Sequence, residues 1–217
     1  MLVAVFGVTD FTEQALRVLR DSSQFSWTTV TLLGLALYVY AVEVERRNWS
    51  AVLAGLAFWC MDWINEVANA LVLHFTDRAA IWTTTGHTSY QILIGLNVEI
   101  SLLFFVSGIV FVKQLPTDPR SKILGLPNRA LLVLAFSCLC VLVEVVLHEA
   151  GVFHWEYWWW NVPNVTLIIL LGYATFFAAA AWVYDMRERS KQLAVVGTLA
   201  AIDAALLIAF GPILSWI

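Results

Sequence analysis

The chain has 217 residues, of which 61% are hydrophobic and only 13% are charged, and its mean hydropathy is +0.79. A soluble domain needs more charged side chains than this to cover its surface, so the composition indicates an integral membrane protein. The net charge is −4 and no basic run occurs, so nucleic acid is not an expected partner. The three cysteines form no CxxC pair and are expected to act as apolar fillers.

Hydropathy predicts an all-α, polytopic membrane helical bundle that forms one domain over residues 1–217. Runs of about 20 largely apolar residues are long enough to cross a hydrocarbon core of roughly 30 Å. Before the first run, an apolar stripe at helical spacing predicts a short amphipathic helix on the membrane surface. The stripe consists of Phe11, Ala15, Val18 and Leu19. Six spans are predicted, at about 26–44, 50–75, 89–112, 129–150, 163–184 and 192–215.

The distribution of Lys and Arg between the loops predicts the orientation of these spans. The loops after the first, third and fifth spans contain nine basic residues, whereas the opposite side of the membrane has only Arg17, Arg20 and Arg78. By the positive-inside rule, both termini are therefore expected on the non-cytoplasmic side. The nine residues are Arg46, Arg47, Lys113, Arg120, Lys122, Arg129, Arg187, Arg189 and Lys191.

Several acidic residues fall inside the spans, although an ionisable group costs roughly 2.5–3.5 kcal/mol at a helix centre. Every Lys and Arg lies at a span end or in a loop, so these acids have no cation beside them within the spans. Three arrangements would accommodate them: the carboxyls are protonated, they bind a metal ion, or they line a hydrated cavity. The polar residues concerned are Asp62, Asn65, Glu66 and Asn69 in the second span, Glu99 in the third, Glu144 and His148 in the fourth, and Asp203 in the sixth.

Helical spacing and depth predict that these groups meet. Asp62 and Glu66 share one face of their span. Glu144 and His148 share one face of theirs, and all five acids fall between mid-membrane and the outer third. We therefore expect an acidic, aromatic-lined chamber in the outer half of the bundle, partly walled by the stretch LVEVVLHEAGVFHWEYWWWN. The residues expected to bind substrate there are Trp59, Trp63, Asn65, Asn69, His148, Asn161 and Asn164, with Glu149, His154 and Glu156 at the rim.

The leading hypothesis is an enzyme that acts on an apolar isoprenoid or lipid by acid-initiated cyclisation or isomerisation. A carboxylic acid kept neutral by burial can donate a proton, and a second acid can accept one. Asp62 or Glu66 is the expected donor. No cofactor is expected, because GxGxxG, P-loop, CxxCH and HExxH motifs are absent. The catalytic partners expected are Asp203, Glu99 and Glu144.

The stretch ERRNWSAVLAGLAFWCMDW, a charged loop followed by a span with a tryptophan and an acid midway, resembles the small integral-membrane terpene cyclases of meroterpenoid and indole-diterpene pathways. That resemblance implies a first catalytic acid at Asp62, with Glu66 as a substitute, and a second at Asp203 in the last span. It extends loosely over the first three spans and by position over the sixth. Those cyclases have seven helices, one more than predicted here.

Two alternatives from other classes stay open. Asp62, Glu66, Glu99, Glu144 and His148 are the ligand types of a carboxylate-bridged iron or manganese pair, which would make the protein a metal-dependent membrane oxidoreductase. The acids could also serve as relays in a proton- or metal-coupled transporter, or line a lipid-binding protein. The two halves of the chain show no internal repeat of the kind many transporters have. Whether the chain forms a homo-oligomer is open as well.

Overall fold

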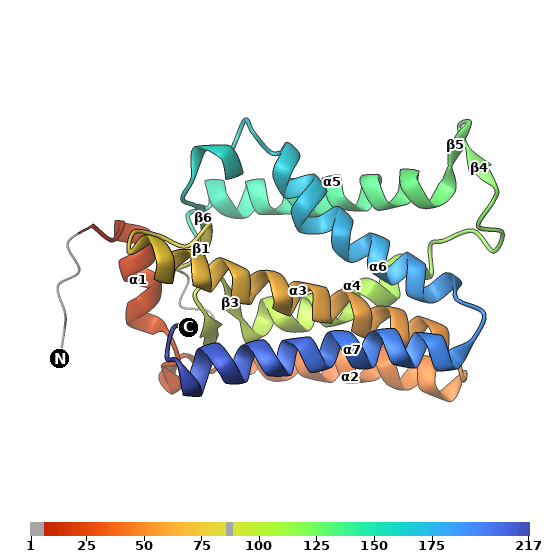
Figure 1. Cartoon of the computed structure of the whole chain (residues 1–217), viewed down its shortest axis with the longest axis horizontal. Coiled ribbons are helices and arrows are strands. Elements are labelled where there is room, and N and C mark those ends of the chain that lie inside the picture. The colour runs from red at the N-terminus through yellow and green to blue at the C-terminus, as the bar shows by residue number, and fades with distance from the viewer. Residues whose placement is uncertain (1–6, 86–88) are drawn as a thin grey trace.

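The computed structural model describes residues 7–85 and 89–217 and is a bundle of long helices, with short strands joining several of them (Figure 1). The all-α membrane bundle predicted from hydropathy is confirmed. Its helices are α1 (Asp10–Val18), α2 (Trp27–Glu45), α3 (Trp49–Thr76), α4 (Val98–Val112), α5 (Asn128–Glu149), α6 (Ala174–Asp185) and α7 (Arg189–Ile208). A π-helix, η3 (Ile168–Tyr173), runs into α6, and a second, η4 (Ala209–Ile213), continues α7. Short 3₁₀ turns are η1 (Ser22–Gln24) and η2 (Trp158–Trp160).

Within the described ranges, five helices are long and apolar enough to cross a membrane, and α4 is the shorter sixth. The span predicted at 89–112 is wrong over its first part. Residues 91–97 instead form a small hairpin of β2 (Gln91–Leu93) and β3 (Leu96–Asn97). The Asn97 side chain accepts a hydrogen bond from the Ile100 amide at 2.8 Å, which starts α4 there. The hairpin is buried, and most of its residues are therefore apolar. Their high hydropathy is why the segment was predicted to be part of a membrane span.

Helix α3 is the centre of the bundle and packs against α4, α6 and α7. Its approach to α4 depends on two glycines that face each other. A Cβ added to Gly108 would lie 2.8 Å from the Cα of Gly55, and one added to Gly55 would lie 2.7 Å from Ile109. Small residues at such a crossing let two membrane helices come close enough for extensive van der Waals contact. The rings of Phe58 and Phe177 then fill the space beside this crossing, with centroids 4.8 Å apart.

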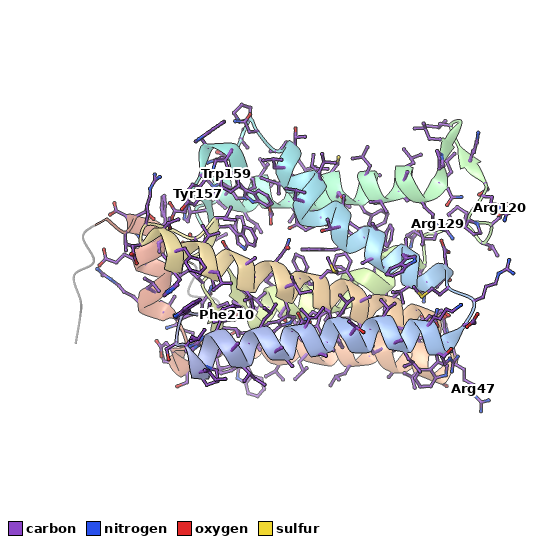
Figure 2. The ribbon with its side chains drawn as sticks, viewed as in Figure 1. Arg47, Arg120, Arg129, Tyr157, Trp159 and Phe210 are labelled. Atoms are coloured by element: carbon purple, nitrogen blue, oxygen red, sulfur yellow. The ribbon has the colours of Figure 1, made fainter. Side chains whose placement is uncertain are left out.

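The two ends of the bundle have different chemistry. The C-terminus and α1 lie at one end, called here the terminal end, and the loops α2–α3, α4–α5 and α6–α7 lie at the other, called the basic end (Figure 1). Figure 2 shows Arg47, Arg120 and Arg129 at the basic end and Tyr157 and Trp159 at the terminal end. The separation of charge predicted from the loops is therefore present in the fold.

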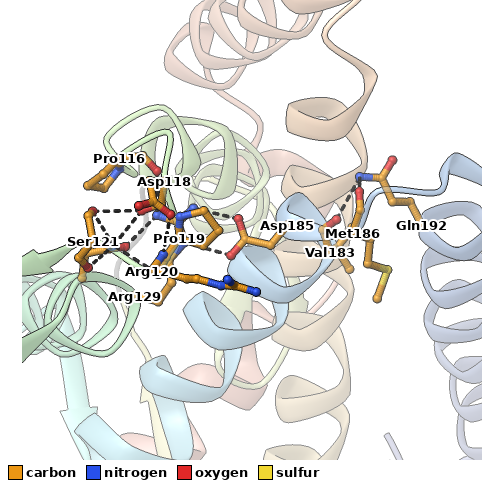
Figure 3. Close-up of polar contacts among 11 residues, drawn as sticks. Pro116, Asp118, Pro119, Arg120, Ser121, Arg129, Val183, Asp185, Met186 and Gln192 are labelled. Atoms are coloured by element: carbon orange, nitrogen blue, oxygen red, sulfur yellow. Dashed lines mark hydrogen bonds and ion pairs between the residues drawn. The ribbon is translucent and has the colours of Figure 1, made fainter.

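Polar contacts hold the basic end together, as Figure 3 shows. The Arg129 guanidinium donates two hydrogen bonds to the Asp185 carboxylate, at 2.9 and 2.7 Å, and so ties α5 to α6. The Gln192 amide at the start of α7 donates to the Val183 carbonyl at 2.9 Å and to the Met186 carbonyl at 3.3 Å. The loop between α4 and α5 contains the hairpin β4 (Lys122–Ile123) and β5 (Leu126–Pro127).

At the terminal end, β1 (Trp82–Thr84) pairs with β6 (Phe153–Trp155) in an antiparallel ribbon, and α1 docks beside it. The Thr9 and Thr12 hydroxyls donate to Glu156 at 2.7 and 3.1 Å, and the Phe11 ring stacks on His154 with centroids 3.6 Å apart. The predicted amphipathic helix is thus present, but Ala15 is buried against the protein. Glu156, expected at the rim, anchors α1.

Candidate functional site

A cavity of about 310 Å³ lies in the half of the bundle nearer the terminal end, between α3, α4, α5 and the η3–α6 helix. Most of its wall is apolar and aromatic. Three acids, Asp62, Glu66 and Glu144, share it, and the lining residues among the described part of the chain include no Lys, Arg or His. The remaining lining residues are Phe58, Asn65, Trp82, Gly95, Ile100, Leu103, Phe104, Ser107, Leu139, Cys140, Val143, Leu147, Phe153, Trp160, Ile168, Gly172, Tyr173 and Phe176.

Glu66 is 4% exposed and is held from the terminal end by a tryptophan. The Trp82 indole N–H donates to Glu66 Oε1 at 3.0 Å, whereas Oε2 has no hydrogen-bond partner among residues 7–85 and 89–217. Trp82 is fixed in turn by Asn69, whose side chain donates to the Trp82 carbonyl at 2.8 Å and accepts from the Ile81 amide at 2.7 Å. A Cβ on Gly95 would lie 2.5 Å from the Trp82 ring, so glycine lets the indole reach over Glu66.

Glu144 projects from α5 into the same cavity and has a different partner. The Tyr173 hydroxyl donates to Glu144 Oε1 at 2.6 Å, and Glu144 Oε2 is buried with no hydrogen-bond partner among the residues that the structure describes. Tyr173 is the last residue of the π-helix η3 and is itself buried. Short O–H···O bonds of this kind are typical when the acceptor is a carboxylate.

Asp62 is 3% exposed, and its Oδ2 has no hydrogen-bond partner in the described part of the chain. The ionisable groups that act on it electrostatically are Glu66, Asp203 and Glu144, all of them acids. Buried charges in proteins are normally paired with an opposite charge. A site that gathers acids, with no cation among the described lining residues, therefore suits carboxyl groups in their neutral form.

The other two acids predicted for the site lie outside the cavity. Asp203, on α7, neighbours Asp62 and Cys60 but is not among the lining residues. Glu99, in the first turn of α4, is partly buried with one unpartnered oxygen and does not line the cavity either.

Most of the side chains predicted to bind substrate serve the scaffold. The Trp59 indole donates to the Ser101 hydroxyl at 3.0 Å between α3 and α4, and Trp63 packs edge-on against Trp59. Asn161 donates to the Trp155 carbonyl at 3.2 Å and Asn164 to the Trp158 carbonyl at 3.0 Å, which orders the loop before η3. Only Asn65 of the predicted binding set lines the cavity.

The donor set for a metal pair is not assembled. Among residues 7–85 and 89–217, no group of three or more His, Cys, Asp or Glu side chains is placed to hold a metal ion. His148 is turned out of the cavity, with its Nδ1 3.1 Å from the Phe153 carbonyl oxygen and its ring stacked on Trp155. The residues present therefore do not fit the iron or manganese pair that the spacing had suggested.

Tyr173, Trp82 and Cys140 line the cavity but were not predicted as wall residues, whereas Trp160 belongs to the stretch LVEVVLHEAGVFHWEYWWWN that was expected to form part of the wall. Tyr173 could have been found, because it is the one tyrosine in the middle of the fifth apolar run. Trp82 and Trp160 come from loops that meet only in the folded chain, where their rings stack with centroids 5.6 Å apart over the cavity. No local pattern predicts that pairing.

Comparison with known proteins places residues 9–212 in a family described as "Uncharacterized membrane protein family". A protein of Archaeoglobus fulgidus, "Uncharacterized protein", is 51% identical over 209 residues, which is 96% of this chain and 99% of that one. A second, shorter Archaeoglobus fulgidus protein with the same description is 48% identical over 56 residues, 26% of this chain and all of its own. No solved structure matches. With the helical bundle and its apolar spans, the match over nearly the whole chain shows that this protein belongs to that membrane protein family.

Proposed function

We propose that the protein is an integral-membrane enzyme that starts the cyclisation or isomerisation of an isoprenoid-like substrate by proton transfer. The observation that supports this is the set of three buried carboxyl groups in an aromatic cavity, each with one oxygen that accepts no hydrogen bond from the residues described. A carboxyl without a counter-ion in such surroundings favours its neutral form, and a neutral carboxylic acid is a proton donor.

The reaction balances without an oxidant, a reductant or a second substrate. The O–H bond of the Asp62 or Glu66 carboxyl breaks, and its proton adds to one carbon of a substrate double bond, whose π electrons form the new C–H bond. The adjacent carbon becomes a cation, which a second double bond of the same chain attacks to close a ring. A neighbouring carbon then loses a proton to a carboxylate, so the product is an isomer of the substrate. Transfer of that proton back to the donor, between carboxyl groups that share the cavity, restores the starting state.

Glu144 is suited to accept that last proton. A hydroxyl donor such as Tyr173 stabilises the carboxylate form of its partner, whereas Asp62 Oδ2 has no donor. The cation formed in between would lie among the rings of Phe104, Tyr173 and Phe176, whose faces attract positive charge.

We propose the same orientation that the positive-inside rule predicts, with the basic end in the cytoplasm and the terminal end outside. The cavity then lies in the outer half of the bilayer, with α1 and the β1–β6 ribbon on the non-cytoplasmic surface. A substrate would reach it from the outer leaflet.

Conversion in D₂O tests the proposal directly. Purified protein is incubated with farnesol, geranylgeraniol or the lipid extract of the expressing cells, and products are analysed by mass spectrometry. A proton-initiated isomerisation gives a product of the substrate's mass in H₂O and one mass unit more in D₂O. Glu66→Gln and Asp62→Asn keep the side-chain shape, and the more important of the two is expected to lower turnover at least about 100-fold.

The matched control is Glu149→Gln, because Glu149 is exposed at the end of α5 and does not line the cavity. It should retain full turnover. Unchanged turnover in both Glu66→Gln and Asp62→Asn, or a product without deuterium, would overturn proton initiation. Tight binding of the lipid with no conversion would make the protein a lipid carrier instead.

A further inference from the structure

A second hollow of about 320 Å³ adjoins the acidic cavity on the side of α2, α4 and α5. The two share four wall residues, Leu103 and Ser107 of α4 and Leu139 and Cys140 of α5. The second hollow, called here the tail groove, adjoins the cavity at these four residues, called here the shared neck. Its other lining residues are Leu32, Leu35, Leu102, Val106, Val110, Phe136 and Phe177.

The tail groove extends from the neck toward the basic end. On α4, the cavity begins at Ile100 and the groove reaches Val110. At 1.5 Å per residue this is a path of about 15 Å along the helix. Because α5 runs the opposite way, its cavity residues reach Leu147 at the terminal end and its groove residues reach Phe136 at the other. Both helices place the far end of the groove toward the basic end, while Leu32 and Leu35 line it from the half of α2 nearer the terminal end.

The lining of the groove fits a hydrocarbon chain and little else. It contains no charged residue among those described, and its Ser107 hydroxyl is already committed to the Leu103 carbonyl at 2.7 Å. The groove also opens to the lipid-facing surface, because Leu103, Val110 and Leu139 are 52%, 45% and 54% exposed. In a bilayer such side chains contact acyl chains, so a chain can enter sideways without crossing water.

We propose that the tail groove binds the distal end of a long prenyl or alkyl chain whose reactive end lies at Asp62, Glu66 and Glu144. The substrate class is then a membrane-dissolved chain longer than the acidic cavity alone can hold, admitted laterally between α4 and α5. This deepens the proposed function and rests on it for the identity of the reactive end. The occupant of the groove is the tail of the substrate itself, since the groove adjoins the cavity that contains the carboxyl groups.

Binding of a prenol length series tests this independently of turnover. Ten-, fifteen- and twenty-carbon prenols (geraniol, farnesol and geranylgeraniol) are titrated against the detergent-solubilised protein. Val110→Trp fills the far end of the groove without touching the cavity. This substitution is expected to lower the affinity for the twenty-carbon prenol about tenfold, the effect of leaving about two methylene groups unburied. The affinity for the ten-carbon prenol should not change.

Val146→Trp is the matched control, because Val146 is 61% exposed on α5 and lines neither hollow. It should bind all three prenols as the native chain does. The proposal for the tail groove would be overturned if Val110→Trp lowered the affinity for every prenol equally or for none. It would also be overturned if the native protein bound no prenol. If binding depended on chain length but no deuterium entered the product, the role of the groove would be supported and the proposed reaction would be refuted. The two failures can therefore be told apart.

Discussion

At the scale of single residues, the carboxyl groups of the cavity differ mainly in their donors. Glu66 accepts from an indole and Glu144 from a phenol, and Asp62 Oδ2 accepts from neither. Helical spacing predicted that Asp62 and Glu66 share a face, and both line the cavity. The same rule gave a wrong result for His148, because that residue lies in the last turn of α5, where its ring stacks on Trp155 beyond the cavity wall.

Removing the phenol that donates to Glu144 is expected to slow the proposed reaction. Tyr173→Phe leaves the ring in place and deletes the 2.6 Å bond to Glu144, so the carboxylate form of Glu144 loses stabilisation. A hydrogen bond to a charged group contributes about 1.5–3 kcal/mol, which corresponds to a 10- to 100-fold fall in kcat with KM little changed. Steady-state turnover of the active prenol measures both quantities. Tyr184→Phe, outside the cavity, should behave as the native protein, and an unaltered kcat in Tyr173→Phe would remove Glu144 from the reaction.

At the scale of elements, the ends of helices were harder to predict than their middles. The run before α4 is apolar enough to be taken for membrane helix, yet Gly95 and the Asn97 cap make it a hairpin. Asn69 was predicted to bind substrate, but its side-chain amide donates to the Trp82 carbonyl and accepts from the Ile81 amide at the start of β1. The backbone there needs hydrogen-bond partners where it crosses α3. Hydrogen bonds of this kind join segments that are distant in the chain, so residue spacing within one helix does not predict them.

The docking of α1 is expected to depend on pH. Burial lowers the pKa of His154 below its usual value near 6.5 and the nearby His148 acts in the same direction, although the Gly151 carbonyl and Glu156 oppose them. When α1 detaches, His154 becomes accessible and its pKa returns toward 6.5. The undocked state therefore binds more protons as the pH falls below about 6.5, so docking weakens there and is at full strength above it.

Hydrogen exchange of the α1 amides at pH 7.5 and pH 5.5, corrected for the intrinsic rates, measures this effect. Protection should fall at pH 5.5 in the native chain. His154→Phe keeps a ring against Phe11, which stacks there at 3.6 Å, but cannot be protonated, so its protection should be the same at both pH values. Equal loss of protection in both chains would show that another group controls the docking.

At the scale of the whole molecule, the sequence alone predicted the class of fold and the separation of basic loops from the terminal end. These features follow from composition and from the cost of placing charge in a bilayer. The cavity itself was predictable only in part. Its acids come from α3 and α5, but its roof is built by Trp82 and Trp160, which two separate loops bring together. The shared neck to the tail groove depends on how α4 and α5 are spaced, which no single span encodes.

We propose that the buried carboxyl groups act on an apolar ligand by proton transfer. Native mass spectrometry of the gently purified protein, read for both metal and organic mass, tests it most directly. We expect an isoprenoid or other lipid to be bound to the native protein and to the Glu149→Gln variant. Leu147→Trp fills the cavity, so this variant should retain the lipid more weakly. One or two transition-metal ions, present in the native protein and lost on Glu144→Gln, would contradict it.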